Sequence, residues 1–208
     1  RLRLLQQRAL WRQRPSTACK DLEELAQQDQ GGLLAFHTAR RLLIRFSGAE
    51  TVLESMMRFA NDCELLEETI EPVLLCASSL DTSAALELLG QSALNLMRLE
   101  SEDLARILVM QMQGSDIKAP ASLMAQARLQ AIDGQPVEAC QRLLESAVRE
   151  PIKPEQIELA RLAVELGGLE GIQLRKLQSR WPEDGVIVLG CALDRLKSGR
   201  AVDATELE

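Results

Sequence analysis

One histidine and five cysteines are the side chains in this chain best suited to nucleophilic or metal chemistry. His37 stands in the segment LLAFHTARRLL, where no nearby serine or cysteine forms a recognisable nucleophile–base pair. The cysteines show neither a CxxC motif nor the Cys/His spacing of a zinc site. We therefore interpret His37 as a packed or half-exposed helix residue and predict no metal site. The cysteines are Cys19, Cys63, Cys76, Cys140 and Cys191.

Two pairs of acidic residues, Glu67–Glu68 and Glu102–Asp103, have the chemistry for general acid–base catalysis. Both pairs fall on polar faces of predicted helices, where solvation is the simpler interpretation. The glycine pairs at Gly31 and Gly167 resemble helix stops, and neither belongs to a phosphate-binding GxxxxGK[ST] motif. We predict that the chain is not an enzyme and needs no cofactor. Catalysis by His37 on a helical scaffold is the alternative.

The composition predicts an all-α fold. Leu, Ala, Gln, Glu and Arg dominate, and these residues favour helices. Aromatic residues, which favour strands, make up only 2 % of the chain, and there is no tyrosine.

Charge and cysteine usage limit the possible partners and locations. The net charge is −7, which opposes the nonspecific attraction to nucleic acid that clustered Lys and Arg provide. No apolar run approaches the roughly 20 residues that a membrane span needs. An odd number of scattered cysteines is typical of a reducing compartment, so we expect an intracellular, cytoplasmic protein.

Apolar residues recur at spacings of three and four along nearly the whole chain, which indicates amphipathic helices joined by short loops. Because the loops are short, consecutive helices should pack antiparallel. The predicted helices span 2–13, 17–29, 33–46, 49–61, 64–78, 82–98, 102–115, 120–132, 136–149, 154–166, 169–180, 185–197 and 200–207.

The second half of the chain repeats itself with a period near 34 residues. Gly134, in the turn AIDGQPVEA, is the reference position, and its equivalents are Glu100, Gly168 and Gly199. The positions seven residues earlier hold Ala93, Ala127, Arg161 and Ala192. The positions five residues later hold Ala105, Ala139, Gln173 and Ala204. Small residues therefore recur where two helices would approach closely.

This pattern resembles the tetratricopeptide repeat, a 34-residue helix–turn–helix unit, most clearly over Asp133 to Pro151 and Ser198 to Ala204. The resemblance implies a right-handed α-solenoid of antiparallel helix pairs. It covers residues 85–208. Residues 1–84 lose the register, although Gly48 could be another turn, and we read them as degenerate repeats of the same array or as a helical cap.

In that family the first helix of each unit lines a concave groove that holds a partner. The resemblance implies an apolar groove with an acidic rim, suited to an amphipathic helix or an extended apolar segment of a protein or peptide. The chain's own helices, or a second copy of the chain in a homo-oligomer, are alternative occupants of this groove. The residues assigned to partner binding are Leu94, Met97, Met124, Arg128, Leu162 and Leu193, and the same positions include Ala131, Glu158, Glu165, Leu189 and Leu196.

These observations predict a scaffold or adaptor domain of an intracellular assembly. The alternative is a regulatory or sensor region of a larger signalling protein, which is suggested by a chain that begins at Arg1 rather than at methionine.

Overall fold

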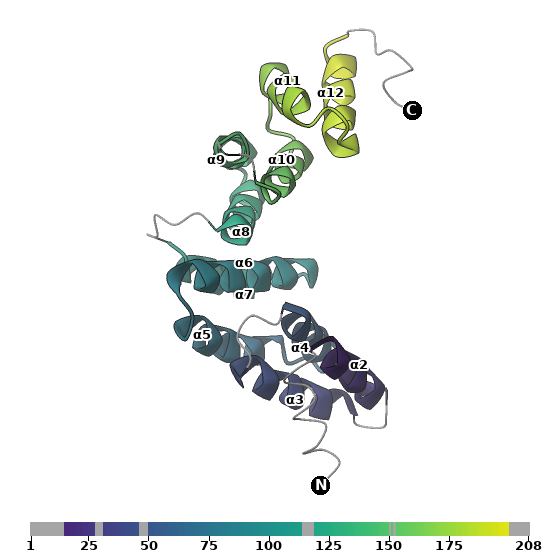
Figure 1. Ribbon diagram of the computed structural model, residues 1–208, viewed down its shortest axis with the longest axis vertical. Coiled ribbons are helices and arrows are strands. Elements are labelled where there is room, and N and C mark those ends of the chain that lie inside the picture. Colours follow the sequence, from purple (N-terminus) through teal and green to yellow (C-terminus); the bar gives the residue numbers. More distant parts are fainter. Residues whose placement is uncertain are drawn as a thin grey trace. The chain divides into compact units, whose positions relative to one another are not determined.

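The structure is a computed structural model that describes residues 15–27, 31–45, 50–113, 119–149, 151 and 153–199. Over these residues the chain forms helices and no strand, which confirms the all-α class (Figure 1). The predicted helices at 2–13 and 200–207, and the predicted turn at Gly48, lie outside the described residues. The α-helices are α2 (Pro15–Ala26), α3 (Gly31–Arg45), α4 (Glu50–Asp62), α5 (Ile70–Ser78), α6 (Thr82–Arg98), α7 (Glu102–Gln111), α8 (Pro120–Ile132), α9 (Pro136–Ala147), α10 (Gln156–Glu165), α11 (Gly171–Arg180) and α12 (Gly185–Lys197).

Helix boundaries follow local chemistry. Helices α6, α8 and α12 have the predicted limits, and α6 and α12 each begin after an aspartate that caps the first turn. The helix predicted over 64–78 is divided into a 3-10 turn, η1 (Leu66–Thr69), and α5. Pro72 explains part of this division, because a proline lacks the N–H that a helix interior needs and is tolerated only in a first turn.

A left-handed turn closes five of these helices. Glu64, Glu100, Gly134, Gly167 and Gly199 have φ values of 58°, 58°, 84°, 73° and 67°, and they follow α4, α6, α8, α10 and α12. The N–H of Glu100 donates to Met97 O, and the N–H of Ser101 to Leu96 O, at 3.1 and 2.9 Å. This pair of bonds is the Schellman motif, which satisfies carbonyls left over at a helix C-terminus. The turns thus recur every 32 to 36 residues along the chain.

The fourth turn corrects the position of one repeat. The left-handed residue is Gly167, not Gly168. Counting back seven residues from Gly167 gives Ala160, which is completely buried, in place of Arg161. The small residue that the sequence pattern lacked is therefore present one position earlier.

Contacts divide the chain into an N-terminal unit, residues 1–122, and a C-terminal unit, residues 123–208. The predicted boundary at 84/85 marks where the sequence repeat becomes clear, whereas the division at 122/123 is based on contacts. The boundary at 84/85 therefore stays a prediction.

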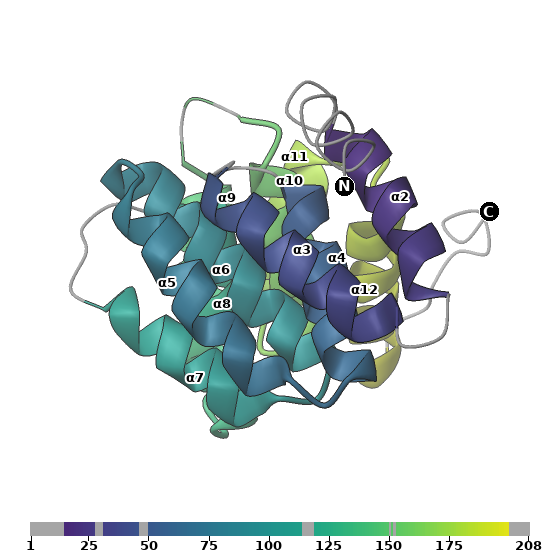
Figure 2. The ribbon, with the colours of Figure 1, turned by 90° about the horizontal axis from the view of Figure 1, so that it is seen from below.

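The N-terminal unit has two layers of helices. Helix α4 contacts α2 and α6 in one layer, and α5 contacts α3 and α7 in the other. Figure 2 shows α3 lying between α2 and α5. Large side chains that are almost fully buried fill the space between the layers, among them Leu22, Phe36, Leu43, Leu53, Met56, Met57, Leu96, Leu108 and Met112.

The C-terminal unit has a core rich in alanine. Helix α10 contacts α9 and α12, and α11 contacts α12. Small side chains let these helices approach closely, while a few aliphatic residues fill the remaining volume. The buried cluster comprises Ala127, Ala139, Leu143, Ala147, Leu159, Ala160, Leu162, Ala163, Leu177 and Ile187.

Gly90 lies where α6 meets the start of α8. A Cβ atom at Gly90 would be 2.3 Å from the carbonyl carbon of Ala121 and 2.3 Å from the nitrogen of Ser122. Both atoms belong to backbone, so a side chain could be accommodated only if a helix moved.

We predict that Glu100→Gly raises the free energy of unfolding by about 1 kcal/mol, because a non-glycine residue is strained at positive φ. Glu145→Gly is the matched control, since it removes the same charge from an exposed position inside α9 and should cost about 0.5–1 kcal/mol. Urea unfolding followed by circular dichroism measures both. A destabilised Glu100→Gly variant would contradict the assignment of the turn.

Gly90→Ala should lower the free energy of unfolding by about 1–3 kcal/mol, because the added methyl group meets the backbone of Ala121 and Ser122. Gly185→Ala places the same group in open space at the start of α12 and should change stability by less than about 0.5 kcal/mol. Thermal unfolding distinguishes the two, and equal effects would argue against a close approach at Gly90.

Candidate functional site

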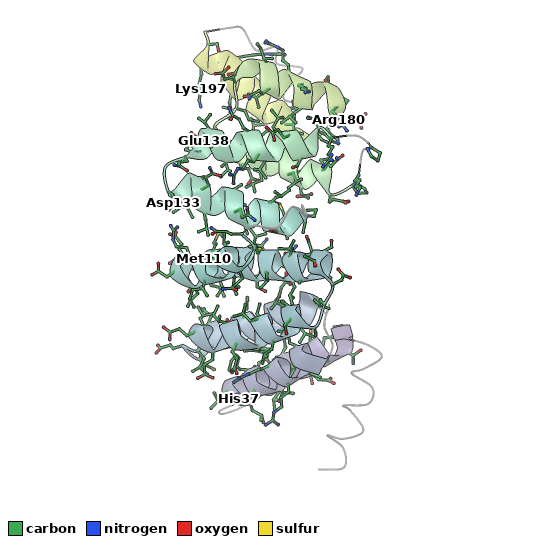
Figure 3. All side chains as sticks on the ribbon, turned by 90° about the vertical axis from the view of Figure 1, so that its left-hand side faces the viewer. His37, Met110, Asp133, Glu138, Arg180 and Lys197 are labelled. Atoms are coloured by element: carbon green, nitrogen blue, oxygen red, sulfur yellow. The ribbon has the colours of Figure 1, made fainter. Side chains whose placement is uncertain are left out.

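His37 and Cys140, two residues with catalytic potential, lie in different environments, one exposed and one buried. His37 is exposed on α3, with its ring 5.2 Å from that of Phe36 (Figure 3). Cys140 is buried, and its thiol lies 3.2 Å from Ala163 O. Burial raises the pKa of the Cys140 thiol, and this effect outweighs an opposing hydrogen bond from the Gly168 backbone. Among the described residues, no group of three or more His, Cys, Asp or Glu side chains is placed to hold a metal ion.

The two acidic pairs meet in one cavity of the N-terminal unit. Its volume is about 780 Å³, and it lies where the turns after α4 and α6 come together. Arg40, on α3, forms ion pairs with Glu68 at 4.0 Å and with Glu71 at 2.6 Å nearby. The carboxylates lining the cavity are those of Glu64, Glu67, Glu68, Glu100, Glu102 and Asp103.

The structure separates the six predicted groove residues. Leu94 and Met97 belong to the N-terminal unit, where Leu94 is buried and Met97 is half-buried. The remaining four belong to the C-terminal unit. Of these, Leu162 is in the core and Met124 packs against it, whereas Arg128 and Leu193 are exposed.

Leu162 is buried because the turn lies at Gly167. Arg161 lies six residues before Gly167. Arg58 lies six residues before the turn residue Glu64, and Arg128 lies six residues before the turn residue Gly134. Three arginines therefore occupy one repeat position on α4, α8 and α10.

Each of these arginines is held by an acidic residue of another helix. Arg58 bonds to Glu23 of α2 at 2.7 Å, and Arg128 lies 3.5 Å from Glu165 of α10. Arg161 contacts Asp184, the N-cap of α12, through Nε at 2.9 Å and Nη2 at 2.8 Å. The ion pairs therefore link α2 to α4 in the N-terminal unit, and α8 to α10 and α10 to α12 in the C-terminal unit.

Asp184 is the most buried acid of these pairs. Burial by itself raises the pKa of its carboxyl group, but hydrogen bonds from Arg161, Ile187 and Val186 together with the Arg161 charge lower it below the usual value. The hydrogen bond to Asp184 and the Asp184 charge, together with Glu158, raise the pKa of Arg161. Asp184 thus fixes the start of α12 against α10 as an ionised group.

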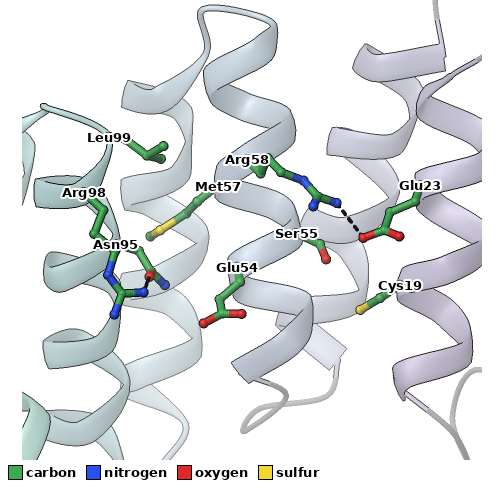
Figure 4. Close-up of a pocket in the computed structure, with 9 residues that line it drawn as sticks. All are labelled: Cys19, Glu23, Glu54, Ser55, Met57, Arg58, Asn95, Arg98 and Leu99. Carbon is green, nitrogen blue, oxygen red and sulfur yellow. Dashed lines mark hydrogen bonds and ion pairs between the residues drawn. The ribbon is translucent and has the colours of Figure 1, made fainter.

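A pocket opens between α2, α4 and α6 of the N-terminal unit, on the layer that the predicted groove would use (Figure 4). Its volume is about 450 Å³. Six of its nine lining residues are polar or charged, although apolar atoms contribute most of the lining surface. The lining residues are Cys19, Glu23, Glu54, Ser55, Met57, Arg58, Asn95, Arg98 and Leu99.

Helix α12 carries an exposed apolar surface. Leu189, Leu193 and Leu196 are 51 %, 48 % and 58 % exposed, and their spacing of four and three places them on one face of the helix. We call these three residues the leucine stripe. All three were assigned to the groove on sequence grounds.

The sequence signals did not identify the polar pocket residues. Asn95 and Arg98 each stand one position after a predicted groove residue, Leu94 and Met97. Glu54 and Arg58 precede a turn at Glu64, and no glycine marks that turn in the sequence.

Comparison with known protein families, with curated proteins and with solved structures finds no match to this chain. None of the described helices combines the length and the apolar character needed to cross a bilayer.

We predict that Asp184→Asn destabilises the protein at pH 7 and that the difference from the parent chain disappears in acid. A carboxyl group with a lowered native pKa stabilises the fold above its unfolded pKa, near 4, and this contribution is lost as pH falls through the native value. Asparagine keeps the N-cap acceptor but not the charge. Denaturant unfolding from pH 7 to pH 2 measures the difference. Asp81→Asn, at the exposed N-cap of α6, is the control and should give a nearly constant difference.

Proposed function

We propose that this chain is a protein–protein interaction domain, a scaffold or adaptor, with two separate contact surfaces: α12 of the C-terminal unit, and the layer formed by α2, α4 and α6 of the N-terminal unit. The leucine stripe carries the proposal. Three leucines about half exposed on one helix face are unfavourable in water, and contact with an apolar partner surface would remove them from it.

Two further observations support this function. The left-handed turns recur every 32 to 36 residues, as a stack of tetratricopeptide-like helix pairs would require. In that family the first helix of each pair contributes the binding residues. By this count α6, beside the pocket, and α12, which carries the leucine stripe, are both first helices.

The partner that best fits the leucine stripe is an amphipathic helix or an apolar extended segment. Each leucine that becomes buried contributes roughly 1–2 kcal/mol, because only about half of its surface is exposed in the free protein.

Replacing exposed leucines tests the proposal without disturbing the core. Leu94 and Leu162 are unsuitable, because both are buried and aspartate there would unfold the protein. We expect Leu189→Asp combined with Leu193→Asp to weaken partner binding at least tenfold, with unchanged thermal unfolding.

Ile172→Asp is the matched control, since Ile172 is 73 % exposed on the second helix α11 and should not affect binding. The measurement is co-purification from the native source, followed by titration of the recovered partner. Unchanged affinity of the double variant would refute the role of the leucine stripe, and a change in oligomeric state would identify a second copy as the occupant.

A further inference from the structure

The α2–α4–α6 pocket contains four charged side chains, and only two of them pair with each other. Glu23 and Arg58 form the 2.7 Å ion pair between α2 and α4. Among the described residues, Glu54 has no hydrogen bond or ion pair, and Arg98 has only a long bond, 3.4 Å, to Asn95. In Figure 4, Glu54 points from α4 toward Asn95 and Arg98 of α6.

A buried amide lies beside these two charges. Asn95 is 8 % exposed and lines the pocket. Arg98 has only donors, so the Asn95 oxygen must accept its bond, and the Asn95 amide nitrogen must then be directed elsewhere. No described residue accepts a hydrogen bond from that nitrogen. That nitrogen reaches solvent in the pocket, where a ligand carbonyl can accept a hydrogen bond from it.

The pocket therefore offers three separate contacts: the Glu54 carboxylate on α4, and the Arg98 guanidinium and the Asn95 amide donor on α6. A ligand that uses all three must carry a cationic group, an anionic group and a carbonyl oxygen. Neighbouring packed helices lie roughly 8–10 Å apart. Side chains two or three residues apart on an extended peptide are separated by about 7–10 Å.

We propose that the α2–α4–α6 pocket binds an extended peptide segment in which a lysine or arginine and an aspartate or glutamate are two residues apart, so that both side chains lie on the face toward the pocket. The basic side chain pairs with Glu54, the acidic side chain pairs with Arg98, and a main-chain carbonyl between them accepts from Asn95. This inference rests on the proposed function and specifies the chemistry of the bound segment.

The test uses fluorescein-labelled twelve-residue peptides, amidated so that the C-terminus adds no charge, and the full chain. One peptide places Lys and Glu two residues apart in a neutral Ala/Gln/Ser background. Comparison peptides carry two lysines, two glutamates or no charged residue. Fluorescence anisotropy should show the mixed-charge peptide binding roughly tenfold more tightly than any comparison peptide, because charge-assisted hydrogen bonds contribute most to such contacts.

Two charge-neutralising variants separate the contacts. Glu54→Gln should weaken the mixed-charge peptide roughly tenfold and leave the two-glutamate peptide unchanged. Arg98→Gln should weaken the mixed-charge peptide similarly and leave the two-lysine peptide unchanged. Both residues are exposed, so the fold should be retained. Glu145→Gln and Arg142→Gln, exposed on α9, are matched controls without effect.

The inference is overturned if the mixed-charge peptide shows no measurable binding at millimolar concentration, if all four peptides bind equally, or if both variants bind it as the parent chain does. The proposed function fails separately. A partner that is lost on substitution of the leucine stripe but is unaffected by Glu54→Gln and Arg98→Gln would preserve the interaction domain and refute only the charge-selective pocket.

Discussion

The left-handed turn that follows α4, α6, α8, α10 and α12 is the constraint on which the rest of the described structure depends. It reverses the chain within a few residues and satisfies terminal carbonyls, so the next helix must pack against the one before it. Its position also sets which face of the first helix is buried. Moving the turn by one residue rotates that face by about 100°, because a helix advances 3.6 residues per turn. The consequence is visible at α10, where Leu162 is in the core and Arg161 is half-buried at its edge.

Glycine at this turn has two distinct purposes. Gly167 supplies the positive φ, whereas Gly168 provides room, since a Cβ there would lie 2.7 Å from the oxygen of Pro136. Both positions therefore favour glycine for different physical reasons. Sequence alone cannot tell which of two adjacent glycines is left-handed, because either adopts that conformation without strain. The predicted register of this repeat was wrong by one residue for that reason.

The helical class and most helix limits could be predicted from the sequence, because apolar spacing and helix-forming composition act locally. The turn at Glu64 could not. Glutamate is rarely left-handed, so no residue type marks that turn, and the turn at Glu100 is indicated only by its distance of 34 residues from Gly134. Packing of the flanking helices holds these residues in a conformation that their own preference opposes. The polar pocket depends on the first of these turns, since Glu54 and Arg58 are placed by their distance from Glu64.

The same repeat position has different chemistry on different helices. Six residues before the turn, α4, α8 and α10 carry arginines paired with acids, and α12 carries Leu193. A paired arginine stays partly hydrated and links neighbouring helices, while an exposed leucine gains only by contact with another surface. The arginines are therefore explained by the fold itself, and Leu193 is not. This difference is the reason for proposing α12 and, separately, the α2–α4–α6 pocket as contact surfaces, rather than every helix that carries this repeat position.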